Sequence, residues 1–118
     1  METITMNDSG QNNVENSELI ELGRQLGLKT SQGKKALEYS LKCVQLLDRK
    51  QQDYGPNNIA YSGELGIAVR VMDKCCRLRH ILESKGDVQF EAKTDTYMDM
   101  ANYGLIGMML DNGDWDKK

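Results

Sequence analysis

The feature that most constrains the fold is an almost uncharged run near the C-terminal end, DTYMDMANYGLIGMML, at positions 95–110. Apart from Asp95 and Asp99, its side chains are apolar, small or uncharged. A helix that is hydrophobic almost all round is normally buried. Two buried carboxylates one turn apart are costly unless cations or a metal ion compensate them. The run therefore predicts a buried helix whose aspartates face positive charge.

The compensating charge is expected on the preceding apolar segment, GELGIAVRVMDKCCRLRHIL, at positions 63–82. Helical spacing places four charged residues on one face of this segment, with apolar side chains on both flanks. They are Arg70, Asp73, Lys74 and Arg77. One interpretation is an internal salt-bridge network between these cations and the two aspartates Asp95 and Asp99. The other is a polar pocket built for a ligand.

Two further helices are expected upstream. Apolar residues recur about one turn apart in SELIELGRQLG at 17–27 and predict a short helix that Gly27 ends. A stronger helix is expected over 31–52, where an apolar stripe runs opposite Lys and Gln, and it stops before Gly55 and Pro56. These two segments supply one short and one long helix.

The fold class predicted is all-α. The third helix runs to about Lys85, the fourth begins near Thr94, and no segment shows strand alternation with turn residues. We expect a small antiparallel bundle of three long helices and one short N-terminal helix. Residues 1–16 are polar and predict a disordered tail, and residues 17–118 a single helical domain. The last helix is so apolar, in so short a chain, that we expect it to be shared with a second copy, which predicts a homodimer or homotetramer.

Composition excludes several classes of function. A net charge near −3 and a pI near 5.1 argue against a duplex DNA binder. No apolar run is long enough to span a membrane, and no secretory signal is visible at the start. The three cysteines (Cys43, Cys75 and Cys76) form neither a disulfide framework nor a zinc motif. Reduced cysteines favour a cytoplasmic protein.

The pocket interpretation assigns chemistry to the charged residues. Magnesium is usually held by one or two carboxylates together with waters and phosphate oxygens. The candidate metal ligands are Asp73, Asp95 and Asp99, of which Asp95 and Asp99 are also the candidate catalytic residues. Arginine forms bidentate contacts with phosphate, and lysine supplies a point charge. The candidate phosphate-binding residues are therefore Arg70, Lys74 and Arg77.

Three uncharged residues are further candidates for substrate binding. Tyr54 can stack on a base or pack on the core, and Asn58 can contact a polar edge or cap a turn. Asn102 follows Asp95 and Asp99 on the same face of the last helix. Each of these side chains suits a nucleotide site as well as an ordinary structural role.

Several of these motifs together resemble a known family. KQQDYG, GIAVRVMDKCCRL, and DTYMDMANYGLIGMML followed by GDW are similar to the family called nucleotide modification associated domain 1. Its members are small helical proteins common in phages and bacteria, and the resemblance covers roughly residues 40–115. It implies a role in phage-type nucleotide metabolism, in the host cytoplasm if the protein is phage-encoded.

A more distant similarity is to the MazG-like all-α nucleoside triphosphate pyrophosphohydrolases, which hold magnesium with ExxE on one helix and ExxD on the next. This sequence offers Asp73 among basic residues in place of ExxE, and Asp95 with Asp99 in place of ExxD. The similarity implies magnesium-dependent hydrolysis of a (deoxy)nucleoside triphosphate to monophosphate and pyrophosphate. The alternatives are a non-catalytic module that sequesters a nucleotide or a host defence signal, and a purely structural protein.

Overall fold

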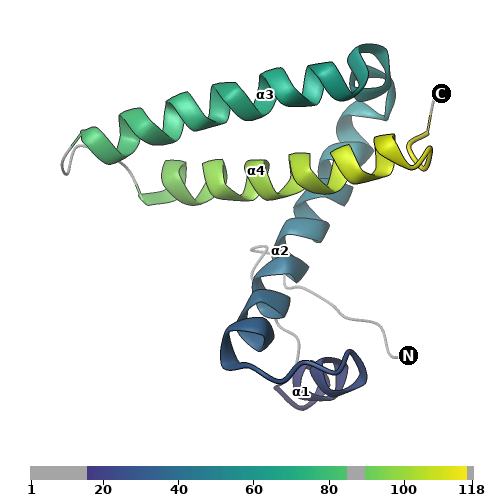
Figure 1. Cartoon of the computed structure of the whole chain (residues 1–118), viewed down its shortest axis with the longest axis vertical. Helices are drawn as coiled ribbons and strands as arrows, with labels where there is room; N and C mark the ends of the chain where they lie inside the picture. The colour runs from purple at the N-terminus through teal and green to yellow at the C-terminus, as the bar shows by residue number, and fades with distance from the viewer. Residues whose placement is uncertain (1–15, 85–89, 117–118) are drawn as a thin grey trace. The chain divides into compact units, whose positions relative to one another are not determined.

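The computed structural model describes residues 16–84 and 90–116, and all regular secondary structure in them is helical (Figure 1). The four helices are α1 Asn16–Gln25, α2 Ser31–Tyr54, α3 Asn57–Glu83 and α4 Phe90–Asp111. The predicted all-α fold class is confirmed. The boundaries fit only roughly, because α3 begins at Asn57 rather than near Gly63, and α4 at Phe90 rather than near Thr94. The predicted tail lies outside the described residues, except for Asn16.

The chain divides into two compact units, one ending at Leu46 and one beginning at Leu47, so α2 contributes to both. In the first unit, α1 ends at Gln25, just before the stop predicted at Gly27, whose φ of 73° is a left-handed conformation that glycine adopts without strain. The amide of Leu28 donates to the carbonyl of Gly23 at 3.0 Å and closes this cap. α1 is thereby turned toward the start of α2.

The second unit is organised around α3 and α4, which run antiparallel and side by side (Figure 1). Its core is formed by Ile59, Ile67 and Ile106, each no more than 7% exposed. Burial of an isoleucine side chain stabilises a fold by about 2 kcal/mol. Trp115 packs against this cluster, and its Nε1 donates to the carbonyl of Pro56 at 3.0 Å.

α3 is broken near its start. Gly63 has φ 61° and ψ −153°, a backbone conformation outside the helical region, so residues 57–62 form a separate turn before the long segment 64–83. This region of φ and ψ is accessible almost only to glycine. Because the helix is broken at Gly63, the helical spacing of apolar residues in the long segment begins only after that residue.

The described part of α4 is buried on one side only, contrary to the expectation that it is buried all round. Thr96, Asn102 and Ile106 are 1%, 5% and 6% exposed, whereas Tyr97 and Met108 are 51% and 60% exposed. The uncharged outer face of α4 is therefore open in a single chain. In residues 16–84 and 90–116, no helix combines the length and the apolar character needed to cross a membrane.

Candidate functional site

A pocket of about 140 Å³ lies in the second unit, where the end of α2, both segments of α3 and the middle of α4 meet. Five of the residues that the sequence nominated line it, and three polar neighbours join them. The nominated residues are Tyr54, Asn58, Arg70, Asp99 and Asn102, and the added ones are Lys50, Gln51 and Tyr103. Leu47, Ile59 and Ile106 form its apolar floor.

Asp99 is the most highly connected charge in this pocket. Its Oδ1 accepts from Lys50 Nζ and its Oδ2 from Lys74 Nζ, both at 2.9 Å. The Asp99 side chain is 16% exposed. Burial disfavours the charged carboxylate, but the two lysine contacts outweigh burial and lower the pKa of Asp99 below its usual value. The salt bridge predicted between the third and fourth helices is thus formed by Lys74 and Asp99.

Two other polar groups in the pocket lack partners. Arg70 Nη1 and Asn102 Oδ1 are both inaccessible to solvent, and neither has a hydrogen-bond partner in the part of the chain that the structure describes. Asn102 as a whole is 5% exposed. An unpaired buried polar group costs about 1–3 kcal/mol, and such groups are rare in native proteins. Arg70 and Asn102, two residues that line the same small pocket, thus each carry one buried polar atom without a partner.

The break at Gly63 builds this part of the pocket. In an uninterrupted helix, Asn58 and Arg70 would stand about 18 Å apart along the axis, beyond the reach of an arginine side chain. The turn of residues 57–62 instead brings the carbonyl of Asn58 within 3.4 Å of Arg70 Nη2. The side chain of Asn58 meanwhile accepts from the amide of the adjacent Ile59 at 2.9 Å, a local contact within the turn.

Tyr54 stands at the rim of the pocket. It is the last residue of α2 and its side chain is 69% exposed. An exposed ring beside a cationic pocket is available for stacking, whereas packing on the core would have buried it. Of the two roles considered for Tyr54, the structure leaves the ring free for the first.

Four nominated residues do not line the pocket. Asp73, Arg77 and Asp95 are exposed, and Lys74 reaches the pocket only through its contact with Asp99. Nowhere in residues 16–84 and 90–116 do three or more His, Cys, Asp or Glu side chains gather in a way that could hold a metal ion. The triad of Asp73, Asp95 and Asp99 suggested for magnesium is therefore not brought together.

Sequence reasoning missed Lys50 and Gln51. Both belong to the polar stretch DRKQQD, which looks like a solvated helix end. Continuing the apolar stripe of α2 past Leu47 by helical spacing would have reached Lys50, Gln51 and Tyr54 on one face. The helical spacing of α2 thus indicated these residues, but only if its inward face is followed beyond the last apolar residue into the polar ones.

The pocket carries an excess of positive charge. Lys50, Arg70 and Lys74 contribute three positive charges against the single negative charge of Asp99. Such an arrangement attracts an anion, and Arg70 can donate to one in a sheltered geometry. Asn102 can accept a hydrogen bond from a hydroxyl or an N–H of the same ligand.

Comparison with known proteins returned no match, whether to a protein-family model, to a curated protein or to a solved structure. Membership of the nucleotide modification associated domain 1 family, and the more distant MazG-like similarity, therefore stay predictions from sequence. The functional proposal depends on the pocket itself.

Proposed function

We propose that this protein binds a phosphorylated small molecule, a nucleotide, through the pocket around Asp99. The observation that carries the proposal is the pair of unpaired buried groups, Arg70 Nη1 and Asn102 Oδ1, beside two lysines that share one carboxylate. A phosphate would take the place of Asp99 on Lys50 and Lys74 and accept from Arg70. Once the side chains of Arg70 and Asn102 turn toward it, the ligand would also pair these two atoms, which have no partner in the free protein.

The size of the pocket favours one enclosed group with the rest of the ligand outside. Its volume of about 140 Å³ is below the roughly 300–1,000 Å³ of sites that enclose a whole small molecule. A phosphate group fits this space, and a base would then lie at the rim against the exposed ring of Tyr54. Stacking on an aromatic ring contributes about 1–3 kcal/mol per base, which favours a nucleotide over inorganic phosphate.

A binding module is favoured over magnesium-dependent hydrolysis by the positions of the carboxylates. Asp99 already contacts two ammonium groups, which compete with a metal ion for its oxygens. Asp73 and Asp95, the other suggested ligands, are exposed and lie outside the pocket lining. Hydrolysis of a nucleoside triphosphate is therefore the outcome against which the proposal is tested.

The test is calorimetric titration of the full chain with nucleoside mono-, di- and triphosphates, the matching nucleosides and inorganic phosphate, with and without a chelator. We expect a nucleotide to bind, to be recovered intact, and to be insensitive to the chelator. Arg70→Lys keeps the charge but loses the planar fork, and should weaken binding about tenfold. Arg77→Lys, the same change at an exposed position outside the pocket, should leave binding unchanged.

Two results would overturn the proposal. If no phosphorylated compound binds, the unpaired groups serve another purpose. If binding requires magnesium and pyrophosphate is released, the protein is a hydrolase and the carboxylates converge in a way that its resting structure does not display.

We further propose that the protein is a homodimer built on the outer face of α4. Exposed residues there follow the order large, small, small, large: Tyr97, Ala101, Gly104 and Met108. This order is symmetric about its midpoint, so an antiparallel second copy places a tyrosine ring on a methionine at each end. Sedimentation of Gly104→Arg tests this surface, since that variant should be monomeric and still helical.

The thiols bear on the cellular setting. Cys43, Cys75 and Cys76 are all free, as expected of a protein in a reducing compartment. We propose that nucleotide binding takes place in the cytoplasm, which is the host cytoplasm if the protein is phage-encoded.

A further inference from the structure

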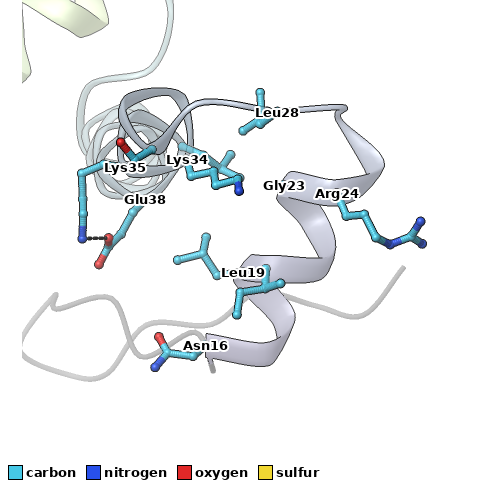
Figure 2. Close-up of a pocket in the computed structure, with 11 residues that line it drawn as sticks. Asn16, Leu19, Gly23, Arg24, Leu28, Lys34, Lys35 and Glu38 are labelled. Atoms are coloured by element: carbon cyan, nitrogen blue, oxygen red, sulfur yellow. Dashed lines mark hydrogen bonds and ion pairs between the residues drawn. The ribbon is translucent and has the colours of Figure 1, made fainter.

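A second and larger pocket lies in the first unit, between α1 and the beginning of α2 (Figure 2). Its volume is about 580 Å³, within the range of sites that enclose a small molecule. No residue of this pocket takes part in the nucleotide site proposed above. The two pockets can therefore be tested separately.

The walls of this second pocket are mainly apolar. Leu19 and Ile20 come from α1, Leu28 from the connecting segment and Leu37 from α2. Ile20 is 71% exposed, so the apolar wall is open to solvent at this edge. Gly23 is buried between the helices, and a Cβ there would touch Leu28 and Leu37 at 3.9 Å. The helices approach closely at Gly23 and leave the remaining space between the leucines.

The charges at its mouth are unequal. Arg24 is paired with Glu21 at 2.7 Å, and Lys35 with Glu38 at 2.9 Å. Lys34 has no ion pair among the residues that the structure describes, and Figure 2 shows its side chain extending from α2 toward α1. Glu38 also lines the pocket, but Lys35 neutralises it. Within the part of the chain that the structure describes, the mouth therefore presents one positive charge without an ion-pair partner, beside an apolar wall.

We propose that this pocket binds a single-chain anionic amphiphile, with its apolar chain against the leucines and its anionic head on Lys34. Apolar walls favour the chain in proportion to the area that they bury. The unpaired ammonium group of Lys34 selects a negative head over a neutral or a positive one. The pairing of Arg24 and Lys35 with their own glutamates leaves Lys34 to make this selection.

The experiment is calorimetric titration of the full chain with decanoate, decanol and decyltrimethylammonium, each below the concentration at which it forms micelles. Decanoate should bind most tightly. Shortening it to octanoate removes two CH₂ groups and should weaken binding up to about fifteenfold. Lys34→Gln should weaken decanoate binding about fivefold, as expected for a partly exposed ion pair, without affecting decanol.

Two variants serve as controls. Lys29→Gln makes the same change at an exposed lysine outside the pocket and should have no effect. Ile20→Glu places a carboxylate at the open edge and should abolish decanoate binding, while Ile20→Gln should keep most of it. Because Ile20 is largely exposed, neither substitution should unfold the chain. Circular dichroism checks that both variants stay helical.

The proposal is overturned if decanol and decanoate bind equally, or if Lys34→Gln and Lys29→Gln behave alike, because binding is then apolar and unselective. It is also overturned if no amphiphile binds; if Ile20→Glu then lowers the oligomeric state, the pocket is covered by a second copy. Neither result bears on nucleotide binding at Asp99.

Discussion

Replacing Asp99 by asparagine separates the two roles that its carboxylate has in the pocket. In the free protein the carboxylate stabilises the fold by contacting Lys50 and Lys74. Under the proposed function, the same carboxylate competes with a phosphate for those two lysines. Asp99→Asn should therefore lower stability and tighten nucleotide binding, a combination that general damage to the fold does not produce.

The size of both effects follows from exposure. Breaking a fully buried ion pair costs about 3–5 kcal/mol, and exposed pairs contribute about 0.2–1 kcal/mol. Asp99 is 16% exposed, Lys74 25% and Lys50 47%, so a loss of about 1–2 kcal/mol is expected between these limits. In a domain of this size that lowers Tm by roughly 5–10 °C. Removing a like charge from the phosphate site should tighten binding about tenfold.

Thermal unfolding followed by circular dichroism measures the first effect, and calorimetric titration with the best nucleotide measures the second. Asp95→Asn is the matched control, because it removes the same charge one turn earlier from an exposed position. That control should change neither quantity appreciably. If Asp99→Asn binds the nucleotide no more tightly than Asp95→Asn does, the carboxylate does not compete with the ligand and the reasoning fails.

Three further predictions follow from the second unit. Gly63→Ala should destabilise the fold by about 1–3 kcal/mol in a urea titration, because alanine is strained there; Gly104→Ala, in open space on a helix, should not destabilise it. Since the pKa of Asp99 is lowered in the folded state, its contribution to folding stability is complete above about pH 4 and is lost as pH falls further. The stability of the parent protein should therefore fall more steeply with acid than that of Asp99→Asn. Trp115→Phe should cost about 1 kcal/mol in urea unfolding, because the hydrogen bond to Pro56 is lost; an unchanged midpoint would contradict this.

The helices were largely predictable because their signals are local. Apolar spacing and the breaks at Gly27 and at Gly55 with Pro56 depend only on neighbouring residues, and both ends fall where the sequence puts them. A contact between Asp99 and a cation of the third helix was also predictable, since a nearly uncharged helix must neutralise its carboxylate; that the cation is Lys74 was not.

What sequence could not provide depends on distant residues. Asp95 and Asp99 share a face of α4, yet only Asp99 lies where α2 also contacts that face. Asp99 is therefore ion-paired with Lys50 of α2, whereas Asp95 is exposed. Helical periodicity alone does not tell how far along a face the neighbouring helix extends. The contribution of Lys50 was missed for the same reason, because its partner is 49 residues away.

The hydrogen bond between the Trp115 indole and the Pro56 carbonyl makes Trp115 an intrinsic fluorescence probe of this region. Pro56 immediately precedes the short turn of residues 57–62, and the Asn58 carbonyl in that turn contacts Arg70. Trp115 is the only tryptophan in the chain, so its emission comes from a single place, tethered to one wall of the pocket. If the proposed nucleotide binds in that pocket, we expect the fluorescence of Trp115 to change without any added label. Cutting the chain just before Trp115 would remove the hydrogen bond to the Pro56 carbonyl.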